Sequence, residues 1–527
     1  MGIVRTNPVD LVFRGCARLA PVPAIALPVI VLMIGLALVA GCSKKEPPGK
    51  AQAKAVAAGD PAEGEAGEGD APVTCKGPEV KGSLAWFSDD YDAARACARD
   101  SARPLVIDLW APWCHTCLSM KHTVLVDKGL EPLAGRFVWL ELDTDQEKNA
   151  VALAKFPPQV WPTFFVAAPA DESVQARYLG AASLTQFRAF LIEGEQAVLA
   201  LQAGDLPEGS PLRLIRDGDQ AMGQGEWTAA RTSYGQALAS LPKESPRRPD
   251  VLVSMISAFY KGKDYPGCFA LAQREMGNTG ASASAADFLY YGATCATRIA
   301  DGSAAEGTTP ASELPDAATL EAFREAAVAR LGAIVDDDGS PMSVDDRGDA
   351  MRIAREIEES LGDKEGARAL AERQRALLDD AAAKAPTPFA AMTYNWPRAE
   401  VYVYLGKPGE LVPALQKSVV DLPTEYDPPY RLAWIYSQMG KHDEALAMAE
   451  KALALGYGPR KTRIQSMIAD LYKARGGSGD RDAERLAREA AVAMYKALPE
   501  TQQRADQLAQ LEQAVAALGE RPAGKGE

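Results

Sequence analysis

The stretch Pro104-Leu-Val-Ile-Asp-Leu-Trp-Ala-Pro-Trp-Cys-His-Thr-Cys117 decides the fold of the first folded part of this chain. Its beginning is an apolar run with one acid, Asp108, which is typical of a buried strand. The pair Cys114 and Cys117 follows at once, where a helix is expected to begin. A strand that leads into a Cys-x-x-Cys pair at a helix start predicts a redox-active dithiol in an α/β domain.

The chemistry expected of this pair is thiol–disulfide exchange. At the start of a helix, unpaired N–H groups and the helix dipole stabilise a Cys114 thiolate. That thiolate attacks a substrate disulfide, and Cys117 resolves the mixed disulfide. A buried Asp108 has a raised pKa and can exchange a proton with Cys117. His115 either adds positive charge near Cys114 or faces solvent, and the sequence leaves both open.

Other interpretations of these residues remain. A lone Cys-x-x-Cys can be half of a zinc site or a static disulfide, and Asp108 can be a satisfied core acid. The surrounding segment has no second Cys-x-x-Cys and holds only two histidines, His115 and His122. We therefore expect no metal. We also expect no cofactor, because the chain has neither a P-loop nor a Rossmann glycine fingerprint.

Apolar runs and helical patterns alternate from about residue 83 to 197, which predicts a layered α/β domain. The expected strands are 104–110, 137–142 and 163–167, and the expected helices are 89–102, 114–133, 146–156 and 183–193.

This segment resembles the thioredoxin fold, and most closely the C-terminal periplasmic domain of DsbD-type thiol:disulfide interchange proteins. The matching residues are 104–117, Asp127 and Trp161-Pro-Thr-Phe-Phe165. The resemblance implies that Cys114 is the nucleophile, Cys117 the resolving thiol and Asp108 the buried acid. It also implies a cis bond before Pro162, with the preceding backbone pairing with the substrate.

The expected substrate-binding residues are therefore Trp113, His115, Trp161 and Pro162. The chain departs from the family at Trp161, which is bulkier than the usual Thr, Val or Ile and narrows access. The His-Thr dipeptide matches neither the thioredoxin nor the DsbD pattern, so the reduction potential of those families cannot be assumed for this Cys-x-x-Cys pair. The electron conduit of DsbD has no counterpart in this sequence, and a partner thiol is expected to supply electrons.

The N-terminal segment is predicted to be a targeting signal. Three arginines precede an apolar run over 24–40, which closes with Val39-Ala-Gly-Cys42 and resembles a bacterial lipobox. The expected organisation is a signal peptide over 1–41, followed over 42–77 by lipidated Cys42 and a disordered tether. A transmembrane anchor is the alternative, but the run is shorter than the roughly 20 residues that span a bilayer. By resemblance to sorted lipoproteins, Ser43 rather than Asp after Cys42 favours the outer membrane of a Gram-negative bacterium, with the protein facing the periplasm.

Four further cysteines are expected in the mature chain. In an oxidising compartment the nearest pairings are Cys75 with Cys97 and Cys268 with Cys295, and we expect structural disulfides. Free buried thiols remain an alternative for all four. Cys75 as an electron relay is a further possibility.

The C-terminal half is helical and repetitive. Short units open with a glycine, and a small residue follows five positions later in all but the Gly406 unit. Gly406 and Gly440 are 34 residues apart, the tetratricopeptide (TPR) period. Each opening glycine is expected to end a helix in a left-handed cap. The opening glycines are Gly225, Gly262, Gly362, Gly406 and Gly440.

The expected fold is thus an α/β thioredoxin-like domain (78–199), a linker (200–209), an all-α TPR-like solenoid (210–516) and a disordered tail (517–527). A net charge of -14 argues against nucleic-acid binding. The predicted function is an anchored thiol–disulfide oxidoreductase for exported proteins, whose TPR groove holds a protein partner. A non-catalytic assembly lipoprotein is the rival, and a helper that keeps haem-attachment cysteines reduced is a third hypothesis.

Overall fold

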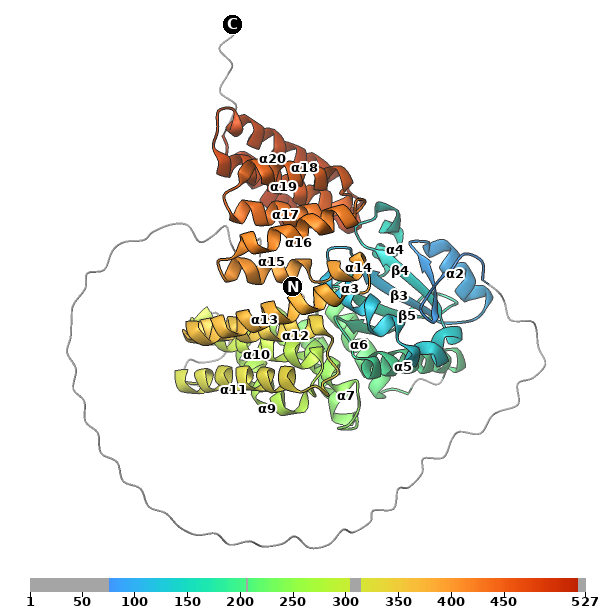
Figure 1. Ribbon diagram of the computed structural model, residues 1–527. Coiled ribbons are helices and arrows are strands. Elements are labelled where there is room, and N and C mark those ends of the chain that lie inside the picture. The colour runs from blue at the N-terminus through green and yellow to red at the C-terminus, as the bar shows by residue number, and fades with distance from the viewer. Residues whose placement is uncertain (1–74, 205–206, 304–313, 520–527) are drawn as a thin grey trace, which may run out of the picture. The chain divides into compact units, whose positions relative to one another are not determined.

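The computed structural model describes residues 75–204, 207–303 and 314–519 (Figure 1). The predicted signal peptide, Cys42 and most of the tether lie outside the described residues, as does the tail beyond residue 519. Among the helices that the structure describes, none is both long and apolar enough to cross a membrane.

Residues 75–204 contain one sheet of six strands, in the order β1-β2-β4-β3-β5-β6. Strand β3 lies inside the sheet, parallel to β4 and antiparallel to β5. The strands are β1 (Glu79–Lys81), β2 (Leu84–Ser88), β3 (Leu105–Trp110), β4 (Val138–Asp143), β5 (Thr163–Ala167) and β6 (Val174–Leu179).

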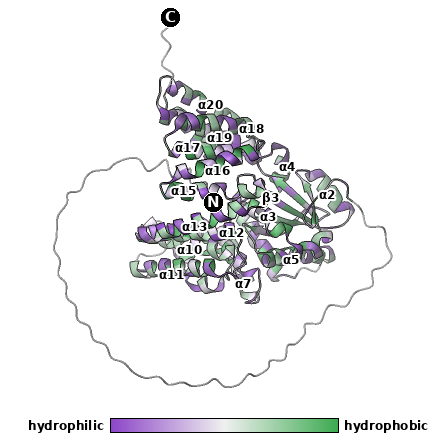
Figure 2. Ribbon diagram, in the orientation of Figure 1, coloured by the Kyte–Doolittle hydropathy of each residue, from purple (hydrophilic) through white to green (hydrophobic). Residues whose placement is uncertain are grey.

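The central strands are apolar because both faces of the sheet are covered. Every residue of β4 and β5 is buried, as is β3 up to its last residue. Such continuous runs are typical of strands with helices on both sides, and Figure 2 shows their hydrophobic colouring. Asp108 is the exception in β3, and the register places it between Glu141 of β4 and Phe164 of β5.

Four helices of the sheet domain are α2 (Tyr91–Asp100), α3 (His115–His122), α4 (Ala150–Lys155) and α5 (Leu184–Ala203). The predicted helix to residue 133 was wrong beyond His122, where 3-10 turns over 124–126 and 128–136 follow. Pro132 in the second turn lacks an N–H, which disfavours a continuous α-helix there. The predicted helix over 146–156 was also too long, because 147–149 form a 3-10 turn before α4.

The last helix of the sheet domain is longer than predicted. The sequence predicted an end at residue 193 and a linker over 200–209, but α5 continues to Ala203. Gly194 lies inside this helix, and a Cβ there would lie 2.7 Å from the Val166 side chain. The glycine allows close packing of α5 on β5 and does not end the helix. The helix instead ends at Gly204, which has a φ of 69°.

The rest of the described chain is helical, and successive helices pack on one another. These helices are α6 (Pro211–Gln224), α7 (Trp227–Ser240), α8 (Arg248–Lys261), α9 (Tyr265–Glu275), α10 (Ala283–Ala300), α11 (Ala317–Asp336), α12 (Val344–Leu361), α13 (Lys364–Lys384), α14 (Pro388–Met392), α15 (Asn395–Tyr404), α16 (Pro408–Asp421), α17 (Asp427–Gln438), α18 (His442–Leu455), α19 (Gly458–Arg475), α20 (Asp480–Ala497) and α21 (Ala505–Ala516).

Most of the predicted glycine turns are present. Gly225, Gly362, Gly406 and Gly440 have φ between 71° and 88°, where a side chain would be strained. The prediction was wrong at Gly262, whose φ is -75°. The left-handed position there belongs to Lys263, with a φ of 58°.

Two disulfides outside the Cys-x-x-Cys pair join the same cysteines as the nearest pairings in sequence. Cys75, ahead of β1, is bonded to Cys97 on α2. Cys268 on α9 is bonded to Cys295 on α10, and both are fully buried. The structure therefore does not have these four cysteines as free thiols.

Candidate redox site

The two cysteines lie where β3 leads into α3. Cys114 is the residue that caps α3, and its Sγ accepts a hydrogen bond from the Cys117 N–H at 3.0 Å. The two sulfur atoms form a disulfide. Placement at the first turn of a helix favours the thiolate of Cys114 once the bond is reduced. Both residues are buried, with Cys114 5% and Cys117 1% exposed.

Asp108 lies on β3, in the strand that leads to the cysteines, and is 2% exposed. Burial raises its pKa to about 6, although Lys121 opposes the shift. The Lys121 Nζ lies 3.6 Å from Asp108 Oδ2. A carboxyl with this pKa holds or releases a proton near neutral pH, as an acid–base group must.

Two charged residues beside Asp108, Lys121 and Glu141, were not predicted from the sequence. Lys121 also pairs with Glu141, which accepts hydrogen bonds from Lys81 and Ser88. Burial alone would raise the pKa of Glu141, but Lys121, Lys81 and Ser88 together lower it to about 2. Glu141 therefore stays ionised and balances the Lys121 charge. The position of Lys121 one helical turn after Cys117 was the available sequence signal.

Two tryptophans stand beside the disulfide. The Trp161–Pro162 peptide bond is cis. The rings of Trp113 and Trp161 have centroids 5.3 Å apart. The Trp161 Nε1–H donates to Thr144 Oγ1 at 2.8 Å, and the Trp113 Nε1–H donates to Asp145 Oδ2 at 2.9 Å. These bonds hold both rings against the apolar cluster that contains the cysteines.

Helix α12 of the helical region reaches the dipeptide between the cysteines. The His115 Nδ1 lies 2.9 Å from both carboxylate oxygens of Asp345. Ser343 begins α12 with a capping box, which places Asp345 in the first turn. Nearby, the Ser119 hydroxyl donates to Ser343 at 3.0 Å. His115 is 9% exposed, so the solvent-facing alternative for it was wrong.

Two arginines of the helical region contact Trp113. The Arg431 Nη2–H of α17 donates to the Trp113 carbonyl at 3.2 Å. The guanidinium of Arg460 on α19 lies 4.5 Å from the centroid of the Trp113 ring, within cation–π range. Both arginines are buried.

Two tyrosines bind the acidic loop after β4. Tyr426 and Tyr457 occupy equivalent positions, as the residues that precede α17 and α19. The Tyr457 hydroxyl donates to Asp143 at 2.6 Å, and the Tyr426 hydroxyl donates to Asp145 at 3.1 Å. Burial raises the pKa of Asp143, and the Asp145 carboxyl raises it further. Burial also raises the pKa of Asp145.

We call this set of contacts around the disulfide the seam. It consists of His115 with Asp345, Ser119 with Ser343, Trp113 with Arg431 and Arg460, Asp143 with Tyr457, and Asp145 with Tyr426. None of the helical-region members was singled out from the sequence.

One group in the described chain has the composition of a metal site. Donor atoms of His115, Asp345 and Asp349 lie within 4.8 Å of one another, and all three residues are buried. Asp345 already binds His115, and Asp349 lies 3.5 Å from Arg352. Because both carboxylates already have these side-chain neighbours, we assign no metal to the group.

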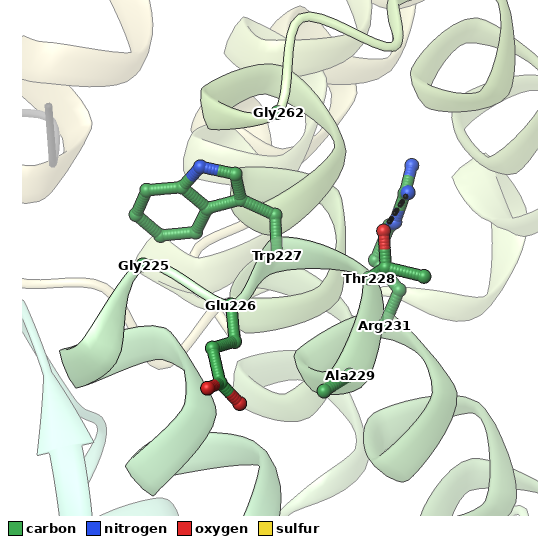
Figure 3. Close-up of a pocket in the computed structure, with 7 residues that line it drawn as sticks. All are labelled: Gly225, Glu226, Trp227, Thr228, Ala229, Arg231 and Gly262. Atoms are coloured by element: carbon green, nitrogen blue, oxygen red, sulfur yellow. Dashed lines mark hydrogen bonds between the residues drawn. The ribbon is translucent and has the colours of Figure 1, made fainter.

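A separate pocket of about 310 Å³ lies where α7 begins (Figure 3). Gly225 and Gly262 line it, together with Trp227 and the first turn of α7. Its one cationic residue, Arg231, already donates to Thr228 and Asp264. No member of the seam lines this pocket.

Comparison with known families and structures matches the two parts separately. Residues 85–169 match a family model described as thioredoxin-like, and 430–455 match a tetratricopeptide repeat model. No curated protein gives a match. A solved tetratricopeptide repeat protein from Parabacteroides merdae is 13% identical and has a TM-score of 0.35, with coverage of 58% of this chain and 99% of that one.

A thermophilic TPR protein from Thermus thermophilus is 18% identical with a TM-score of 0.24, and the match covers 50% of this chain and 98% of that one. TM-scores this low carry no functional argument. The family matches confirm the predicted fold class. The chain joins a thioredoxin-like domain to a helical region of tetratricopeptide-repeat type.

Proposed function

We propose that this chain is a thiol–disulfide oxidoreductase that acts on cysteines of exported envelope proteins. The observation that supports this most is the placement of Cys114 at the start of α3, with its Sγ bonded to the Cys117 N–H. Asp108, whose pKa burial raises to about 6, lies on the preceding strand. The cis bond before Pro162 lies in the same domain.

In the reducing direction, the Cys114 thiolate attacks one sulfur of a client disulfide, and the other client sulfur leaves as a thiolate. Asp108 takes the proton of Cys117. The Cys117 thiolate then attacks Cys114 Sγ, and the second client sulfur is released. Two electrons have passed to the client, and the pair is left as the disulfide. A protein dithiol must return the electrons, and the same steps reversed oxidise a client.

We also propose where in the cell this protein lies. Cys42 carries a lipid that holds the protein at the outer membrane, facing the periplasm, and the tether raises the effective concentration of the domain near envelope clients. Mass spectrometry of the mature protein tests this step, because the chain should begin at Cys42 and carry the mass of acyl groups on that residue. A mature chain without acyl mass at Cys42 would contradict lipid anchoring through Cys42.

Trapping of mixed disulfides tests the enzyme proposal. In a Cys117→Ser chain the attacking thiol of Cys114 has no resolving partner, so client-linked species should accumulate on non-reducing gels. The matched control is Cys114→Ser, which lacks the attacking thiol and should trap far less. Equal amounts of linked protein in the two variants, with both folded, would contradict the assignment of Cys114 as the nucleophile.

The burial of Cys114 favours a second candidate, a non-catalytic assembly protein in which the helical repeats bind partners. A buried sulfur is not available to a client in the described arrangement. An empty trap in folded Cys117→Ser protein, together with partner proteins that co-purify without a disulfide, would support this candidate.

A further inference from the structure

The disulfide of the redox pair is buried, and the helical region contacts Trp113 and His115, the residues on either side of Cys114. Cys114 is 5% and Cys117 1% exposed, although the pair stands at the end of a strand and the start of a helix. Exchange requires an incoming sulfur to approach a disulfide sulfur directly, so access governs its rate. The described arrangement therefore has to change before a protein cysteine reaches Cys114.

The helical-region contacts with the residues beside Cys114 belong to the seam. Helix α12 contributes Asp345 to His115, next to Cys114 in the chain. Helices α17 and α19 contribute Arg431, which donates to the Trp113 carbonyl, and Arg460, which lies over the Trp113 ring. All of them come from the helical region.

The contacts of the seam are polar, so the seam can open at a low cost in free energy. The apolar cluster around the disulfide contains Ala111, Cys114 and Cys117 with three tryptophans, all from the sheet domain. Parting the seam leaves that cluster whole and exchanges protein hydrogen bonds for bonds to water, which costs little net free energy for each bond. The two carboxyls at the seam, Asp143 and Asp145, also repel each other when both are ionised.

A second attachment of the helical region to the sheet domain is of another kind. Ala283 of α10 belongs to the same apolar cluster as Phe187 and Phe190 of the sheet domain. Arg247, the residue that precedes α8, is bonded to Glu193 of α5 at 2.6 Å. Separating this attachment would expose the apolar surface around Ala283, which water does not compensate. The two attachments therefore differ in the cost of opening.

We propose that the helical region is a gate over the redox pair, and that the seam opens while the contacts of Arg247 and α10 stay closed. Exchange at Cys114 follows that opening. The inference does not depend on the proposed function, because it concerns access to the chain's own disulfide.

The test measures how fast tris(2-carboxyethyl)phosphine reduces Cys114–Cys117 in the folded full chain. The phosphine takes an oxygen atom from water and becomes its oxide as the disulfide gains two electrons and the two protons of that water, and the new thiols are alkylated and counted by mass. The test variant is Tyr426→Phe with Tyr457→Phe, which removes two hydroxyls from the seam. Asp143 keeps a backbone donor and Asp145 keeps the Trp113 indole, so the variant should fold.

The control is Tyr402→Phe, which removes a hydroxyl bonded to Asp379 at 2.8 Å inside the helical region. We expect the seam variant to be reduced on the order of tenfold faster than the unaltered chain, because two hydrogen bonds that keep the seam closed are lost and each makes a modest net contribution. The control should keep the unaltered rate. In low urea the rate should change little, since local opening exposes little surface.

Three results would overturn the gate. One is an equal rate in the seam variant and the unaltered chain. Another is equal acceleration in the seam variant and the Tyr402→Phe control. The third is a rate that rises with urea as steeply as global unfolding does. Failure of the proposed function alone would leave these phosphine rates unchanged and would appear only as an empty client trap.

Discussion

Asp108→Asn should make the sheet domain more stable and the redox pair slower. The side chain is buried, and Asp108 Oδ1 has no hydrogen-bond partner among the described residues. Asn keeps the shape of the side chain and removes its charge. Lys121 keeps a carboxylate partner in Glu141. The substitution therefore removes one titratable group and leaves most of the packing contacts unchanged.

The magnitude follows from the pKa. Burial raises the pKa of Asp108 from 3.8 to about 6, so the folded state binds the proton more tightly than the unfolded state. The stability from this group is complete below pH 3.8 and is lost as the pH rises through the raised value. A shift of about two pKa units corresponds to about 3 kcal/mol. The Asn variant avoids this loss and should gain about 1–3 kcal/mol at pH 7.

The assay is urea unfolding of the chain with the pair oxidised, followed by tryptophan fluorescence at several pH values between 3.5 and 8. The unaltered chain should lose stability over that range more steeply than the variant. Reduction of a disulfide-bonded client should slow by about 100-fold near neutral pH, within the usual range for loss of an acid–base group. Equal pH slopes in the two proteins would refute the assignment of a raised pKa to Asp108. An unchanged exchange rate would refute its role as a proton acceptor.

Three further outcomes are expected. Gly458→Ala should lower stability by at least about 1 kcal/mol and speed phosphine reduction, because φ there is 51° and a Cβ would lie 1.9 Å from the Asp145 carbonyl oxygen; an unaltered melting temperature would contradict this. Replacing Cys268 and Cys295 together by Ser should cost about 2–4 kcal/mol in urea unfolding, since the bridge closes a loop between residues 27 apart; a smaller change would mean that the reduced helices hold themselves together. Asp143→Asn should reduce the loss of stability above pH 3.8, because burial and Asp145 raise the pKa of Asp143; an unchanged pH profile from urea melts would argue against that shift.

The parts of the fold that sequence reasoning predicted are those with strong local patterns. Strands β3 and β5 are buried and mostly apolar, and their bounds were predicted to within a residue. Strands β1, β2 and β6 were missed, and β1 has only three residues, at the edge of the sheet. The end of α5 was also mispredicted, because the role of Gly194 depends on its close approach to Val166, a residue of another element.

The residues of the candidate site also divide into those that the sequence predicted and those that it did not. The cysteines, Asp108 and the Trp-Pro pair form a recognisable order along the chain. The contacts of the seam do not, because His115 and Asp345 are 230 residues apart and Trp113 and Arg431 are 318 apart. Members of the seam from the helical region also have ordinary places in their own helices, since Asp345 is an acid in a first turn and Tyr426 and Tyr457 are tyrosines before one. Only the folded arrangement relates them to the redox pair.

The bond between Cys75 and Cys97 also sets how the domain bears mechanical load. Cys75 is the first residue that the structure describes, and the bond connects it directly to α2. Tension on the chain ahead of Cys75 divides between the backbone leading to β1 and the covalent link to α2. Strand β1 is a short edge strand that would otherwise peel from β2 one hydrogen bond at a time. Because of the disulfide, part of a force applied on the N-terminal side acts on α2, which packs on the sheet. Strand β1 therefore bears less of that force.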